Sequence, residues 1–287
     1  MNLFDQLVTE AIKTQPKLSS LRVVVEKELL HHDILRILSH NNLLAELTFI
    51  GGTALRTCYG GTRLSEDLDF TGGHNFNKTS LSKMAHILIE NLNDKYGLPV
   101  NVSEPTKDST NVDTWKIKIE TRALHNHLPA QRINIDICAL PSYEKQPMML
   151  LNHYKVDMGT NGLIIQVQSL EEIYADKLVA FALRLNRIKY RDLWDILWLH
   201  QKGLKPRFEL IPKKLQDRNY KLDDFLDLFN KREQSLIQNK QLLVEFKQEM
   251  RRFLSIEQIN QVIEQDNLWN FITYLIKNLG TQINENC

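Results

Sequence analysis

The chain has 287 residues, of which 43% are hydrophobic and 25% charged, which fits a folded globular protein and argues against a disordered one. Its 36 Lys and Arg residues balance 35 Asp and Glu residues, so any nucleic-acid contact must come from a local basic patch. No segment resembles a signal peptide or reaches the roughly 20 apolar residues of a membrane helix, so we expect a cytoplasmic protein without membrane contact.

The three cysteines carry no C-x-x-C spacing and are an odd number, which fits neither a disulfide framework nor a zinc site. We expect Cys58, Cys138 and Cys287 to be buried thiols in a reducing cytoplasm. His74, His125 and His127 lack the H-E-x-x-H or H-x-x-x-H spacing of metal sites and are interpreted as loop histidines.

The first two-thirds of the chain mixes helical and strand periodicity. The predicted helices are 2–14, 21–45, 53–59 and 80–96. The predicted strands are 47–50, 67–70, 100–102, 114–122, 132–139 and 162–168. The strands at 114–122 and 132–139 alternate apolar and polar residues, so each should have one buried and one polar face.

Helical patterns follow the last predicted strand. Ser169 is a plausible N-cap for a helix to about residue 185, with Glu172 at the capping-box position. The further predicted helices are 190–203, 208–217, 222–236, 239–254 and 256–278. This shift predicts a mixed α/β domain over 1–204, in which helices flank a mixed sheet, and a C-terminal helical bundle over 205–287.

Two carboxylates stand close together on one of the strands. Asp67 and Asp69 are two residues apart, so their side chains should lie on the same face, where they repel unless a cation intervenes. Asp136, on the polar face of another strand, could supply a third carboxylate to a divalent-metal site. A solvated strand edge is the alternative explanation, because D-x-D is a common pattern.

A glycine pair precedes these carboxylates. Gly51 and Gly52, between a strand and a short helix, would let backbone N–H groups approach a phosphate at the helix N-terminus. Arg63 and Ser65 should lie at the mouth of this phosphate site. Their alternative interpretations are a surface arginine and a turn hydroxyl.

A second charged cluster spans residues 175–195. Its cations, of which Lys177 and Arg184 are two helical turns apart, would suit phosphates or an RNA backbone. Alternatively the strip is a solvated helix face with Asp176, Asp192 and Asp195 as ion-pair partners.

These segments, in this order, resemble the AbiEii/AbiGii toxin-like nucleotidyltransferases of the DNA polymerase β superfamily. The matching segments are VEKELL (25–30), FIGGTALRTCYGGTRLSEDLDF (49–70), INIDICAL (133–140) and SLEEIYADKLVAFALRLNRIKYRDLWDIL (169–197). The superfamily more often has serine where this chain has Thr53, and threonine keeps the hydroxyl. The resemblance covers about residues 20–200 and leaves the helical tail unexplained.

The resemblance implies a role for each site residue. The implied metal ligands, for Mg²⁺ or Mn²⁺, are Asp67, Asp69 and Asp136. The expected nucleotide-binding residues are Gly51, Gly52, Thr53, Arg63, Ser65 and Lys177. The expected catalytic residues are Asp67, Asp69, Asp136, Lys177 and Asp192. Whether Asp136 points towards the pair depends on strand register, and Asp195 is expected to support the turn or pair with an arginine.

The implied activity is transfer of a nucleoside monophosphate from a nucleoside triphosphate to an acceptor hydroxyl. RNA, and tRNA in particular, is the leading acceptor, and the resemblance to a type IV toxin implies a cognate antitoxin as partner. A small-molecule or protein acceptor, and a non-catalytic nucleotide- or RNA-binding module, are the alternatives. A continuous basic surface leading to the carboxylates would favour RNA.

Overall fold

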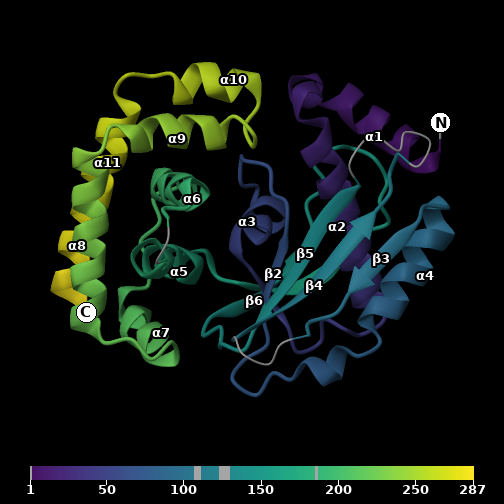
Figure 1. The fold of residues 1–287 in the computed structure, drawn as a ribbon, viewed down its shortest axis with the longest axis horizontal. Helices are drawn as coiled ribbons and strands as arrows, with labels where there is room; N and C mark the ends of the chain where they lie inside the picture. The colour runs from purple at the N-terminus through teal and green to yellow at the C-terminus, as the bar shows by residue number, and fades with distance from the viewer. Residues whose placement is uncertain (1, 107–110, 123–129, 185–186) are drawn as a thin grey trace. The chain divides into compact units, whose positions relative to one another are not determined.

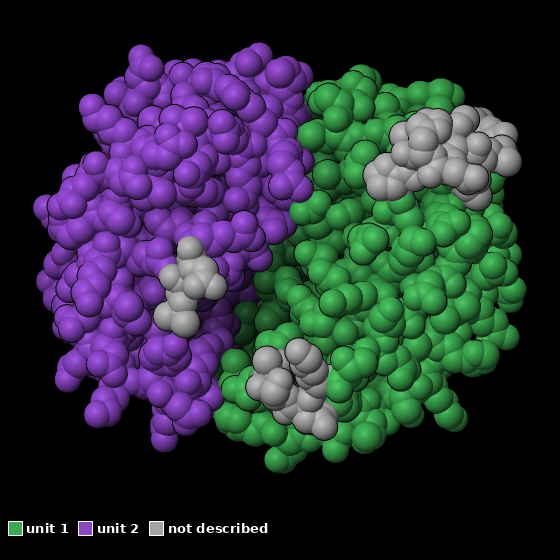
Figure 2. All heavy atoms as spheres, viewed as in Figure 1, with its two compact units in different colours: residues 1–168 green, residues 169–287 purple. Residues whose placement is uncertain are grey.

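The computed structural model describes residues 2–106, 111–122, 130–184 and 187–287, so His125 and His127 lie outside the described residues. Contacts between residues divide the chain into two compact units, Met1–Gln168 and Ser169–Cys287 (Figure 2). The first helices after the last strand therefore group with the C-terminal helices. The domain division at residue 204 stays a prediction.

The first unit is built on a seven-stranded mixed sheet (Figure 1). Its order is β3-β4-β5-β2-β1-β7-β6, with β2 parallel to β5 and antiparallel to β1. The strands are β1 (Thr48–Ile50), β2 (Leu68–Thr71), β3 (Val100–Ser103), β4 (Val112–Ile119), β5 (Gln131–Cys138), β6 (Lys145–Met149) and β7 (Ile164–Gln168). The helices are α1 (Leu3–Thr14), the 3-10 turn η1 (Pro16–Leu21), α2 (Arg22–His40), α3 (Gly51–Tyr59), the 3-10 turn η2 (Lys78–Leu81) and α4 (Met84–Tyr96).

The predicted α/β fold class is confirmed, with differences in detail. The sequence pattern missed β6, whose KQPMM sequence has no period-two alternation and contains a proline. The helix predicted over 21–45 ends at His40, because the chain turns at Asn42, which has a left-handed φ of 58°. The helix predicted over 80–96 is a 3-10 turn followed by α4.

One face of the sheet carries the core. In β4 the side chains of Trp115, Ile117 and Ile119 are buried, whereas Lys116 and Lys118 between them are exposed. Helices α2 and α4 pack against β5 and β3. The polar face of β4 and β5, which also holds Asp136, is accessible, as the alternating sequence predicted.

The second unit, residues 169–287, consists of helices (Figure 1). They are α5 (Leu170–Leu183), α6 (Tyr190–Gln201), the 3-10 turn η3 (Phe208–Leu210), α7 (Ile211–Asp217), α8 (Leu222–Gln238), α9 (Gln241–Met250), α10 (Ile256–Gln258), the π-helical turn η4 (Ile259–Ile263) and α11 (Leu268–Asn286). Ser169 caps α5 by accepting a hydrogen bond from the Glu172 amide, as predicted. In the described part of the chain, no helix combines the length and hydropathy needed to cross a lipid bilayer.

The single helix predicted over 256–278 is wrong. A capping box at Ser255 starts a short helix, a π-helical turn follows, and α11 begins only at Leu268. The apolar spacing continues through Ile259, Ile263 and Leu268, so periodicity alone hides the break.

Candidate active site

The turn between β1 and α3 needs a glycine for two reasons. Gly51, the first residue of α3, has a left-handed φ of 76°. A side-chain carbon there would also lie 2.7 Å from the Oδ2 atom of Asp69. The missing side chain therefore lets the Asp69 carboxylate approach the start of the helix.

Gly52 makes room for a guanidinium group. A side-chain carbon at this position would lie 2.0 Å from an Nη nitrogen of Arg63. Arg63 is only 5% exposed and donates a hydrogen bond to the Leu64 carbonyl at 3.0 Å. The surface-arginine interpretation of Arg63 is therefore wrong.

Ile50, at the N-cap of α3, makes no side-chain hydrogen bond to the first turn. The helix N-terminus and the guanidinium together favour an anion.

Hydroxyl groups join this turn to the segment before Asp67. The buried hydroxyls of Thr53 and Ser65 are 2.6 Å apart, and Thr53 also donates to the carbonyl of Asp67. Ser65 is therefore held beside the first turn of α3. The superfamily more often has serine at position 53. Threonine has the same hydroxyl group, and this hydroxyl makes both hydrogen bonds.

The strand register brings two of the three carboxylates together. Asp69 on β2 and Asp136 on β5 are direct partners in a parallel pair, so their side chains lie on the same face of the sheet. Asp136 accepts a hydrogen bond from the Thr114 hydroxyl at 2.6 Å. Asp67 precedes β2, and its Oδ1 atom accepts a hydrogen bond from the Asn134 amide at 3.0 Å.

These residues fit part of a magnesium site. Among the described residues, no three His, Cys, Asp or Glu side chains form a group that could hold a metal ion by themselves. Mg²⁺ in nucleotide sites is usually bound by one or two carboxylates, with substrate phosphates and water completing the shell. Asp69 and Asp136, next to a phosphate-favouring turn, match that partial set, and Asp67 lies two residues before Asp69.

Glu28 on α2 anchors the segment before Asp67, a role that sequence patterns did not predict. This glutamate is 2% exposed, and its carboxylate accepts hydrogen bonds from the Arg56 Nε at 3.2 Å, the Tyr154 hydroxyl at 2.5 Å and the Ser65 amide at 3.0 Å. The VEKELL segment (25–30) was part of the resemblance seen in the sequence, but its periodicity indicated only a buried helix. The sequence signal that could have identified this role is an ionisable residue, Glu28, on the apolar side of the helix.

The charge of Glu28 is stabilised where it lies. Burial by itself would raise the pKa of this carboxyl, but the Arg56 guanidinium, the Tyr154 hydroxyl and the Ser65 amide outweigh it and lower the pKa. Two neighbours of Glu28 on α2 also hold this segment: His31 donates through Nε2 to the Glu66 carbonyl at 3.0 Å, and Lys27 pairs with Glu66 at 3.1 Å. Helix α2 therefore holds residues 65 and 66 at three points.

The second unit contains the other predicted site residues. Lys177 on α5 pairs with two carboxylates of α6, Asp192 at 2.6 Å and Asp195 at 2.8 Å. Burial would raise the pKa of Asp192, but the charges of Lys177, Lys189 and Arg184 hold it well below its usual range. The three side chains form a buried ion-pair cluster across the two helices.

The basic strip is largely matched by acids of its own unit. Arg184 lies 3.4 Å from Asp192, and Arg191 lies 3.4 Å from Glu249. Asp176 faces Lys214, which is 1% exposed and also pairs with Glu172 at 2.7 Å. The strip therefore follows the ion-pair interpretation more closely than that of an open phosphate-binding surface.

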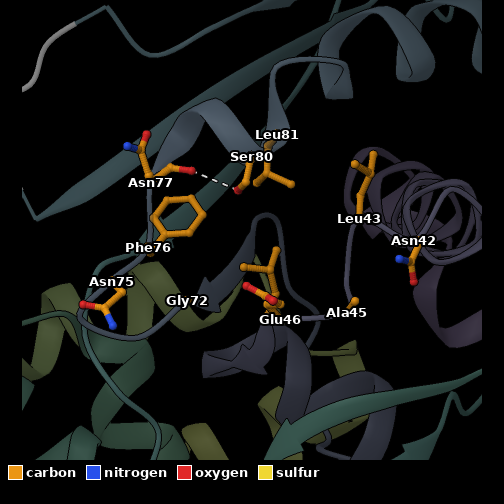
Figure 3. A pocket seen from close by; sticks show the side chains of 11 residues that line it. Asn42, Leu43, Ala45, Glu46, Gly72, Asn75, Phe76, Asn77, Ser80 and Leu81 are labelled. Carbon is orange, nitrogen blue, oxygen red and sulfur yellow. Dashed lines mark hydrogen bonds between the residues drawn. The ribbon is translucent and has the colours of Figure 1, made fainter.

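A cavity of about 390 Å³ lies at the other end of the β1–β2 pair (Figure 3). Its lining includes Leu47, which precedes β1, and Gly72, which follows β2, with the Phe76 ring beside them. Gly51 follows β1 and Asp67 precedes β2, so the predicted phosphate site lies at the opposite end of these antiparallel strands. The cavity is separate from the candidate active site.

Comparison with known protein families gives a match over most of the chain. Residues 33–269 match the family described as nucleotidyl transferase AbiEii toxin of the type IV toxin–antitoxin systems. The chain therefore belongs to the AbiEii nucleotidyl transferase toxin family, as the sequence motifs indicated. No curated protein matches it.

Two solved structures from Helicobacter pylori match this chain. JHP933 is 18% identical with a TM-score of 0.51, and the match covers 91% of this chain and 94% of that one. The second, named as a candidate nucleotidyltransferase, is 17% identical with a TM-score of 0.47, covering 90% and 97%. The similarity to JHP933 extends through both units and supports the fold.

Proposed function

We propose that this protein is a metal-dependent nucleotidyltransferase that moves a nucleoside monophosphate from a nucleoside triphosphate to an acceptor hydroxyl. The observation that carries the proposal is the meeting of the Gly51–Gly52 turn, Arg63 and the Asp69–Asp136 pair in one unit. An anion-favouring turn beside two adjacent carboxylates suits a triphosphate with its divalent cation. Family membership supports the same class of reaction.

In this proposal the turn and Arg63 hold the triphosphate, with Ser65 contributing a hydrogen bond. Asp69, Asp136 and Asp67 would hold Mg²⁺ or Mn²⁺, which when bound neutralises phosphate charge. The acceptor oxygen forms a bond to the α-phosphorus, the bond from that phosphorus to the bridging oxygen breaks, and pyrophosphate leaves. The acceptor proton passes to a carboxylate or water. Most of the catalysis comes from positioning and from charge stabilisation.

From the second unit we also propose Lys177 and Asp192 as catalytic residues, on the basis of membership of the family. Lys177 would neutralise phosphate charge, and Asp192 would contact the nucleotide or assist the reaction. The ion pair with Lys177 keeps the Asp192 carboxylate ionised.

RNA, with tRNA first, is the proposed acceptor, and a cognate antitoxin is the proposed protein partner. Both proposals rest on membership of a type IV toxin family. The protein would act in the cytoplasm.

A transfer assay tests the activity. Wild-type protein and the Asp67→Ala/Asp69→Ala variant are incubated with each α-³²P-labelled nucleoside triphosphate, Mg²⁺ or Mn²⁺ and total tRNA. We expect label on RNA with wild type only. If the triphosphate binds but RNA stays unlabelled, the acceptor is a small molecule or a protein. If neither binding nor transfer is seen, a non-catalytic module replaces the enzyme.

A further inference from the structure

We infer that the polar face of strands β3, β4 and β5 is the docking surface for a single-stranded RNA acceptor. The inference rests on the proposed function, because it assigns the acceptor path of that same site. The observation behind it is the strand register, which places exposed cations in rows that continue directly from the carboxylates.

The first row contains the carboxylates. Asp69 on β2 pairs with Asp136 on β5, and Asp136 pairs with Thr114 on β4. Register partners in a sheet point to the same side, so all three side chains share one face. This row is where the proposed reaction takes place.

The second and third rows are basic and polar. Asn134 pairs with Lys116, which pairs with Ser103 on β3, and these form the second row. The members of the third row are Arg132, Lys118 and Asn101. The cations of both rows are exposed, whereas the residues that alternate with them are buried in the core.

The charges on this face favour a polyanion. Three cations, Lys116, Lys118 and Arg132, lie within two successive rows, and Glu120 pairs with Lys118 at 3.0 Å. Both side chains of that ion pair are exposed, so the pair holds Lys118 only weakly. A phosphate could therefore take the place of the Glu120 carboxylate. The asparagine and serine side chains beside these cations suit hydrogen bonds to phosphate and ribose oxygens.

The length of the surface distinguishes RNA from a small-molecule acceptor. Same-face residues along a strand are about 6.7 Å apart, so the third row lies about 13 Å from the carboxylates. A chain of several nucleotides would contact all three rows with its terminal hydroxyl at the carboxylates. A small molecule at the carboxylates would not reach Lys118 or Arg132.

RNA binding without catalysis tests this surface. The probe is a fluorescent single-stranded RNA of about 12 nucleotides, titrated between about 50 and 200 mM salt. We compare the Lys116→Glu/Lys118→Glu variant with a control variant, Lys13→Glu/Lys83→Glu. The control reverses the charge of two exposed lysines of the same unit that lie outside the sheet. A Lys116→Gln/Lys118→Gln variant and thermal melts exclude misfolding as the cause.

We expect the sheet-face variants to bind the RNA about tenfold or more weakly than wild type, with the control unchanged. The slope of log affinity against log salt should fall by about 0.7 for each phosphate that the variant no longer neutralises. Equal binding by both variants would overturn the docking surface. Absence of RNA binding by wild type would also overturn it, whereas label transfer to a small molecule or protein would leave the nucleotidyltransferase proposal standing.

Discussion

Gly52 and Arg63 share one small space at the start of α3, where a side-chain carbon on the glycine would lie 2.0 Å from the guanidinium. The guanidinium is the far end of a long side chain, so it can shift where backbone could not. An added methyl group should therefore move Arg63 away from the helix N-terminus at modest cost to folding. The two residues form one unit for binding an anion.

This relationship gives the first prediction. Gly52→Ala and Arg63→Ala should each weaken nucleoside triphosphate binding, and the double variant should be little worse than either, because both remove the same guanidinium interaction. A coupling free energy of about 0.5–3 kcal/mol is expected from the cycle, measured by titration calorimetry. Additive losses would show that the glycine and the arginine act independently.

The Asp69–Asp136 pair gives a second prediction. Asp69→Asn and Asp136→Asn should each reduce nucleotidyl transfer about a hundredfold or more, because each removes an ionised metal ligand beside the phosphate turn. Each should leave the free energy of unfolding unchanged or raise it by about 0.2–1 kcal/mol without metal, since like charges directly opposite each other destabilise a sheet.

The matched control for this prediction is Asp113→Asn, because Asp113 lies on β4 opposite Ile137 instead of another carboxylate. The control should keep its activity. Thermal melts with and without Mg²⁺ complete the test: wild type should gain more stability from the metal than either variant. Equal gains would exclude the carboxylate pair as metal ligands.

The Glu28 anchor gives a third prediction. Glu28→Gln leaves Arg56 buried without its charged partner, so the free energy of unfolding should fall by about 3–5 kcal/mol. The Ser65 amide also loses an ionised acceptor. Hydrogen exchange over residues 63–67 should therefore speed up and triphosphate binding should weaken.

Glu26→Gln is the control, because Glu26 is equally buried on the same helix but pairs with Arg22 and Arg122. It should lose stability without changing exchange over residues 63–67 or the triphosphate affinity. If the two variants behave alike in both measurements, Glu28 is only a structural residue.

Two buried lysines of the second unit allow a fourth, paired prediction. Lys177 and Lys214 each lie between two carboxylates, Asp192 and Asp195 for the first, Glu172 and Asp176 for the second. Lys177→Met and Lys214→Met should both destabilise the protein by about 3–5 kcal/mol, because each leaves buried acids uncompensated. Only Lys177→Met should abolish transfer when both are assayed below their melting temperatures. Equal activity of the two variants would remove Lys177 from the catalytic set.

A fifth prediction concerns pH. The pKa of Asp192 is lower in the folded protein than its unfolded value of about 3.9, so its ion pair stabilises the fold above that value. This contribution should be lost as the pH falls through and below about 4. The stability difference between wild type and Asp192→Asn should therefore shrink on acidification, measured by urea unfolding between about pH 7 and 3. A constant difference would contradict an ionised Asp192.

The local sequence was sufficient for much of this protein. Alternation in β4 and β5, the Gly51-Gly52 turn and the D-x-D spacing are short-range patterns, because strands and turns impose their periods on neighbouring residues. They predicted the α/β class, the short helix at the glycine pair and the polar face that holds Asp136. Linked in order along the chain, the motifs also indicated the family.

Only the tertiary structure decided which distant residues meet. The placement of Asp136 beside Asp69 depends on a parallel register that no local period determines, since a shift of one residue would turn the side chain to the other face. The burial of Arg63 against Gly52 joins a helix start to the loop after that helix, and the Glu28 anchor on Ser65 joins segments far apart in sequence. Such contacts arise from packing and from the need to pair buried charges, which act between segments and leave no periodic signal in the sequence.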